Sequence, residues 1–115
     1  MKPNPPTLKT PHRYVLFKVY STHPIEYYNL KNAVYSTLLD FLGESGTAKA
    51  GIRFIKNLWE EKVQRGVIKC SVKYVDILKV SLGLIHQIGD ERVLIRTLRI
   101  SGTIKGLKMS KPKRK

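Results

Sequence analysis

The stretch from Gly66 to Ile100 decides the fold: GVIKCSVKYVDILKVSLGLIHQIGDERVLIRTLRI. Its first five residues follow a charged segment and are mostly apolar, which predicts a strand over 66–70. Apolar residues then recur at helical spacing from Val72 to about Gln87, and they predict a helix with one buried side. Gly89-Asp90 turns the chain, and the apolar run 92–100 predicts a further strand.

Upstream of this stretch, residues 12–20 alternate in the way that is typical of a strand. Val15, Phe17 and Val19 fall on one face of that strand. The other face carries Lys18, so we expect the first face to be turned toward the core.

The segment between these two parts predicts one helix and one more strand. Leucine, valine and phenylalanine side chains form an apolar stripe over 29–42, and Gly43 stands where a helix commonly ends. Residues 43–48 are expected to form a loop or a short helical turn, and 51–57 are expected to form a strand before a charged hairpin connection.

The predicted order is therefore β-α-β-β-α-β, which is typical of an α+β protein of the ferredoxin-like class. We expect a four-stranded antiparallel sheet with both helices on one face, followed by a short C-terminal helix over 101–108. The face without helices is expected to carry apolar residues, and such a face usually binds a partner. The predicted protein-interface residues are Tyr14, Leu16, Leu94 and Leu98.

The chain of 115 residues has a formal net charge of +14. Three of its cations lie in residues 1–13 and six in residues 105–115, and neither segment contains an acid. This distribution predicts a basic domain over 12–107, a flexible basic arm over 1–11 and a basic tail over 108–115. Cationic segments of this kind usually order against a polyanion, and nucleic acid is the first candidate.

Cysteine content and hydropathy bear on the compartment. Cys70 is the single cysteine, which excludes an internal disulfide and fits a reducing compartment. No apolar run approaches the length of a membrane span, and the proline-rich N-terminus does not resemble a signal peptide. We expect a cytoplasmic protein that does not bind membranes.

The sequence contains no pattern typical of a catalytic site. It has no phosphate-loop glycine pattern, no clustered metal ligands and no nucleophile motif. We therefore expect no catalytic residue, no metal site and no cofactor bound by the protein itself. The third strand also lacks the aromatic residues with which RNA-recognition motifs stack bases.

Basic residues instead concentrate around Arg96–Lys105, where a strand runs into a Ser-Gly-Thr turn. Backbone amides in such a turn can hold a phosphate, and Ser101 can alternatively cap the following helix. The predicted RNA-binding residues are Arg13, Lys69, Arg96, Arg99, Lys105, Lys108, Lys111, Lys113 and Arg114.

Four segments of the chain resemble the family of archaeal ribonuclease P protein component 2, which eukaryotic ribonuclease P and MRP share. The most specific segment is RTLRISGTIK at 96–105; the others are RYVLF at 13–17, GESGTA at 43–48 and IKC at 68–70. The family often has threonine where Ser45 stands.

This resemblance implies a subunit of the ribonucleoprotein that removes the 5′ leader from precursor tRNA. It also implies that the RNA carries the chemistry and binds Mg²⁺, while the protein supports the RNA. The implied partners are the ribonuclease P RNA, precursor tRNA, the component 3 subunit, other protein subunits and a second copy of this chain.

Two alternatives use the same fold. A ribosomal or other ribonucleoprotein RNA-binding protein would also need a large positive charge. A metabolite-binding regulatory domain would not, so the charge of +14 argues against it.

Overall fold

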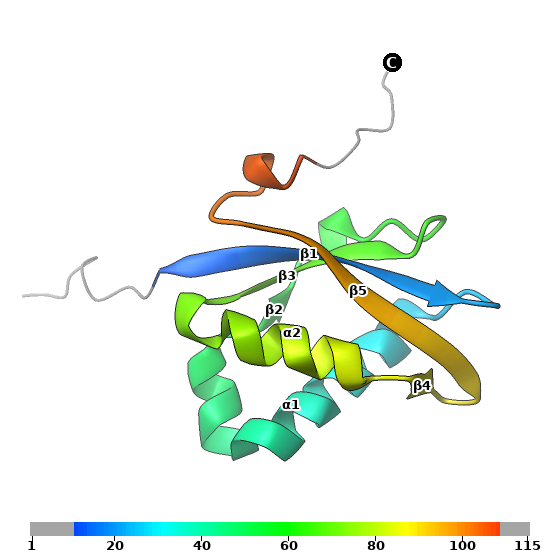
Figure 1. Ribbon diagram of the computed structural model, residues 1–115, viewed down its shortest axis with the longest axis horizontal. Helices are drawn as coiled ribbons and strands as arrows, with labels where there is room; N and C mark the ends of the chain where they lie inside the picture. The colour runs from blue at the N-terminus through cyan, green and yellow to red at the C-terminus, as the bar shows by residue number, and fades with distance from the viewer. Residues whose placement is uncertain (1–10, 109–115) are drawn as a thin grey trace, which may run out of the picture.

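A computed structural model describes residues 11–108, and Figure 1 shows the arrangement of their elements. The predicted N-terminal arm and C-terminal tail therefore lie almost wholly outside the described residues. In this described part, no helix is both long and apolar enough to cross a membrane. The elements are β1 (His12–Ser21), α1 (Tyr27–Ala50), β2 (Arg53–Phe54), η2 (Lys56–Leu58), β3 (Arg65–Ser71), η3 (Val72–Tyr74), α2 (Val75–Leu84), β4 (Gln87–Ile88), β5 (Glu91–Ser101) and η4 (Lys105–Leu107).

The strands form one antiparallel sheet in the order β2-β3-β1-β5-β4. Both helices pack on one side of it, and the short 3₁₀ helix η4 lies on the other side (Figure 1). The predicted α+β fold with two helices and an antiparallel sheet is confirmed. The predicted number of four strands is wrong, because β4 adds a fifth at the edge beside β5.

Strand β4 arises where the second helix ends earlier than predicted. Ile85 follows α2 with an extended backbone (ψ 114°), so the chain leaves the helix before Gln87. Gly89 has a φ of 61°, which a glycine adopts without steric cost. This turn brings Gln87 opposite Arg92 and Ile88 opposite Glu91.

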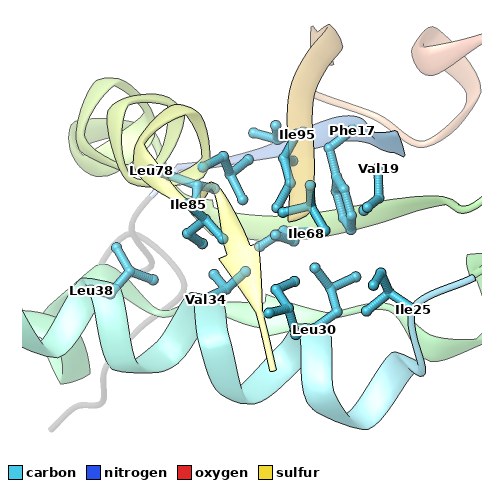
Figure 2. Close-up of a cluster of buried hydrophobic side chains, with 14 of the residues drawn as sticks. Phe17, Val19, Ile25, Leu30, Val34, Leu38, Ile68, Leu78, Ile85 and Ile95 are labelled. Carbon is cyan, nitrogen blue, oxygen red and sulfur yellow. The ribbon is translucent and has the colours of Figure 1, made fainter. Parts of the chain in front are cut away.

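The main core lies between the sheet and the two helices (Figure 2). In β1, Val15, Phe17 and Val19 are all buried, which confirms the predicted core face. In α1, buried side chains recur every four residues at Leu30, Val34 and Leu38. The next position in this series is Leu42, which is half-buried against the core, whereas Phe41 is exposed.

Helix α1 continues past the residue at which it was expected to end. Gly43 interrupts it with φ 71° and ψ 178°, but the chain then resumes helical geometry as far as Ala50. The loop or short turn expected over 43–48 is therefore a full helical extension, which ends at Gly51 in left-handed geometry. This extension leaves only Arg53–Phe54 of the predicted strand 51–57.

Cys70 is fully buried on the core side of β3. Burial raises the pKa of its thiol to about 11, because the thiolate would lose hydration. The thiol is thus a core side chain that stays protonated at neutral pH.

Candidate nucleic-acid interface

The sheet face turned away from the helices, here called the open face, is defined by the strand register. Residues directly opposite each other on neighbouring strands point to the same side of a sheet. Tyr14 of β1 lies opposite Lys69 of β3 and Ser101 of β5. Two residues further along, Leu16 lies opposite Val67 and Arg99.

The next row of the open face consists of three cations. Lys18 in β1 lies opposite Arg65 in β3 and Arg96 in β5. Like charges directly opposite one another destabilise a sheet unless an anion compensates them. Arg65 has such a partner, because its Nε lies 2.6 Å from Glu60 Oε1.

A β-bulge in β5 adds to this face. Leu16 pairs with Arg99 but Phe17 pairs with Thr97, so Leu98 is an extra residue in β5. Thr97 shares the core face with Phe17, and strand alternation then places Leu98 on the open face beside Arg99. The bulge therefore brings two consecutive side chains to the same surface, and both are exposed.

Most cations of the open face lack a carboxylate partner. Within residues 11–108, no salt bridge joins Lys18, Lys69, Arg96 or Arg99 to an acid. Lys18 Nζ donates to the carbonyl oxygen of Val63 at 2.8 Å and lies 5.3 Å from the centre of the Tyr20 ring. Lys69 Nζ lies 5.9 Å from the centre of the Tyr14 ring. These uncompensated charges suit a polyanionic ligand.

Three of the predicted interface residues, Tyr14, Leu94 and Leu98, lie on the open face and are at least partly accessible. Leu94 is 53% exposed and Leu98 is 42% exposed. Leu16 lies on the same face but is only 4% exposed, because Leu107 of η4 packs against it and against Val67. The expectation that Leu16 is available to a partner is therefore wrong.

The Ser-Gly-Thr turn after β5 uses its hydroxyls internally. Ser101 Oγ accepts a hydrogen bond from the Thr103 amide at 3.1 Å, and Thr103 Oγ1 accepts one from the Gly106 amide at 3.0 Å. These two amides are thus occupied. The helix cap expected from Ser101 does not form, because Ser101 Oγ accepts from Thr103, before η4 begins at Lys105. The short C-terminal helix expected over 101–108 is reduced to the single 3₁₀ turn of η4.

The predicted RNA-binding residues divide into three groups by location. Lys69, Arg96 and Arg99 lie on the open face. Exposed Lys105 begins η4 above this face, and exposed Lys108 follows η4 directly. Arg13 lies opposite the buried Cys70, on the helix side of the sheet, and its guanidinium donates to the His12 carbonyl. Lys111, Lys113 and Arg114 lie outside the described residues. Lys18 and Tyr20 were not among the predicted site residues, although the alternation of β1 places them on this face.

Across residues 11–108, no three His, Cys, Asp or Glu side chains are grouped so that they could hold a metal ion.

Comparisons with known proteins agree with one another. The family model described as the Rpp14/Pop5 family matches residues 13–110. The chain is 40% identical to ribonuclease P protein component 2 of Pyrococcus furiosus and 39% identical to that of Thermococcus kodakarensis. Each of these two matches covers 90% of this chain and 85% of the relative. The component of the same name from Methanocaldococcus jannaschii is 32% identical over 99% of this chain and 86% of the relative.

A chain in the cryo-EM structure of yeast ribonuclease MRP has a similar fold. Its TM-score is 0.62 at 13% identity, and the match covers 83% of this chain and 76% of that chain. At this identity the likeness concerns the fold alone. The family model and the archaeal relatives, by contrast, span nearly all of the described residues, and the chain belongs to the Rpp14/Pop5 family.

Proposed function

We propose that this chain is a protein subunit of ribonuclease P, the ribonucleoprotein that removes the 5′ leader from precursor tRNA. The observation that carries the proposal is its membership of the Rpp14/Pop5 family over residues 13–110. Curated relatives with the name ribonuclease P protein component 2 match 90% or more of the chain. They favour this role over that of a ribosomal protein.

In this proposal the RNA performs the cleavage and binds the Mg²⁺ ions, and the protein supplies no catalytic group. The open face supports RNA binding, because within residues 11–108 most of its cations have no carboxylate partner. Such groups can bind phosphates and displace counterions from the RNA. The particle would act in the cytoplasm.

The apolar residues of the open face suit a protein partner. Leu94, Leu98 and Tyr20 are exposed close to the cations, and desolvated aromatic and aliphatic side chains commonly anchor protein interfaces. We propose that component 3 of ribonuclease P, or a second copy of this chain, covers this part of the surface.

We also propose that the fold belongs to the ferredoxin-like class, with β4 as an addition. The succession β1-α1-β2-β3-α2-β5 supports this assignment, because it repeats the β-α-β-β-α-β order once β4 is set apart.

Purification of the tagged full chain from its own cells, under gentle conditions, tests the proposed function. We expect the ribonuclease P RNA in the purified particle, together with cleavage of precursor tRNA at the mature 5′ end. The pure chain with Mg²⁺ should not cleave. Recovery of ribosomal RNA with ribosomal proteins would contradict the proposal, as would specific cleavage by the protein alone.

A further inference from the structure

The second apolar cluster of the molecule lies on the open face, away from the main core. Leu107 is fully buried there, against Leu16 and Val67, which are 4% and 2% exposed. Half-buried Tyr14, Ile55 and Leu58 surround these three side chains. Leu107 thus reaches from the C-terminal segment onto the middle of the open face. The charged residues of this face are basic, except for Glu60, which pairs with Arg65.

The segment that carries Leu107 is held by several local hydrogen bonds. The Thr103 amide donates to Ser101 Oγ and the Gly106 amide donates to Thr103 Oγ1. The Leu107 amide then donates to the Ile104 carbonyl at 3.0 Å, and the Lys108 amide donates to the Lys105 carbonyl at 3.1 Å. A side chain at Gly106 would collide with Ser101, whose Cβ lies 3.1 Å from the position of the added carbon. The hydroxyls and the glycine therefore hold a tight turn, which ends with Leu107 packed against the sheet.

Charge surrounds this buried leucine on both sides in the sequence. Lys105 and Lys108 flank it, and four more cations follow in residues 111–115. A segment whose charged residues are all cations, and in which Leu107 is fully buried, is not explained by solubility alone, because solubility requires no fixed attachment. Attachment fixes the position of Lys105 and Lys108 relative to the cations of the sheet, among them Lys69 and Arg99.

We propose that Leu107 is a positioning residue for RNA binding: it anchors Lys105 and Lys108 beside the open face, so that these two cations and those of the sheet act as one phosphate-binding surface. This inference rests on the proposed function and adds to it the reason why the end of the described chain and the sheet bind together. Without the anchor, Lys105 and Lys108 are attached to the sheet only through the chain that follows Ser101. Effective concentration falls with about the −3/2 power of the length of a free span, so a roughly twofold longer span predicts a roughly threefold weaker contribution of these cations.

The test compares Leu107→Ser, deletion of residues 108–115, and the combination of both in the full chain. The probe is an in vitro transcript of the Pyrococcus furiosus ribonuclease P RNA, titrated at several salt concentrations. Leu107→Ser keeps every charge and should weaken binding about threefold or more at low salt. The loss should shrink as salt rises, and it should be smaller when residues 108–115 are absent.

Three further variants separate anchoring from general damage to the fold. Leu107→Met should restore affinity, because methionine refills the same space. Gly106→Ala should reproduce the loss, because it disrupts the path of the segment while Leu107 and all charges remain. Ile104→Ala is the matched control in the same segment, since Ile104 is 43% exposed, and it should bind as the unaltered chain does.

The inference would be overturned if Leu107→Ser lowered RNA affinity equally with and without residues 108–115. It would also be overturned if Leu107→Ser left the affinity of the full chain unchanged. A loss that persists at high salt would overturn it as well, because a merely structural role does not depend on screening. Each of these three results leaves the ribonuclease P assignment intact, since RNA binding by the unaltered chain is measured in the same titration. If the unaltered chain fails to bind this RNA, the proposed function fails instead.

Discussion

Gly66 lies in β3 where two aromatic rings approach the backbone. A Cβ at this position would lie 2.8 Å from Trp59 Cε3 and 2.9 Å from Phe17 Cζ. Phe17 is fully buried and Trp59 packs against the same core, so neither ring can move away freely. Gly66→Ala should therefore lower the free energy of unfolding by about 1–3 kcal/mol, as overpacking usually does. Urea denaturation followed by circular dichroism measures the change.

Gly83→Ala provides the matched control at the residue scale. Gly83 is exposed within α2, and an added Cβ there meets no atom within 4 Å. Alanine is favoured over glycine inside a helix, so this variant should gain up to about 1 kcal/mol. If Gly66→Ala and Gly83→Ala had the same free energy of unfolding, the close approach of the two rings to Gly66 would not affect stability.

At the scale of elements, β1 and β5 share one face but expose their leucines very differently. Leu94 in β5 is 53% exposed, whereas Leu16 in β1 is 4% exposed beneath η4. Leu94→Lys should change the free energy of unfolding by no more than about 0.5 kcal/mol, because the ammonium group stays in water. If component 3 or a second copy of this chain covers the open face, as proposed, the same variant should weaken that association, which sedimentation velocity measures.

Leu16→Lys is the contrasting variant on the neighbouring strand. A lysine at this position must either bury its charge or displace Leu107 from the sheet, and both are costly. We expect a loss of several kcal/mol in the free energy of unfolding, or local release of η4. Equal stability of Leu16→Lys and Leu94→Lys would contradict the packing of Leu107 on the open face.

At the scale of the whole molecule, positive charge is placed unevenly over two faces. Within residues 11–108, Arg96 and Arg99 of the open face have no salt-bridge partner. Helices α1 and α2 instead balance three lysines with three acids, Asp40, Glu44 and Asp76. If RNA lies on the open face, Arg96→Ala with Arg99→Ala removes two phosphate contacts. The slope of log affinity against log salt should then fall by about 1.4–1.8.

The control removes the same amount of charge from the other face. Lys49→Ala with Lys79→Ala should leave that slope nearly unchanged, although the net charge falls equally. RNA binding titrations at four or five salt concentrations, with all three proteins, measure both slopes. Equal effects of the two double variants would mean that net charge alone, rather than its location, drives binding.

Local sequence periodicity by itself determined most of the element order and the core face. The alternation of β1 identified Val15, Phe17 and Val19 as core residues, because the side chains of a strand repeat every two residues. Alternation along β1 and β5 likewise placed Tyr14 and Leu94 on the open face. The basic residues of β5 were identified as candidate RNA contacts for the same local reason, and their contact with RNA stays a prediction.

Only the tertiary structure decided which apolar residues of that face are covered. Leu16, Val67 and Leu107 are far apart in the chain, and no local pattern indicates that they meet. The bulge at Leu98 is likewise a property of pairing between β1 and β5, not of β5 alone. Strand β4 and the helix beyond Gly43 depend in the same way on contacts with other elements, because tertiary packing outweighs the weak propensities of short segments.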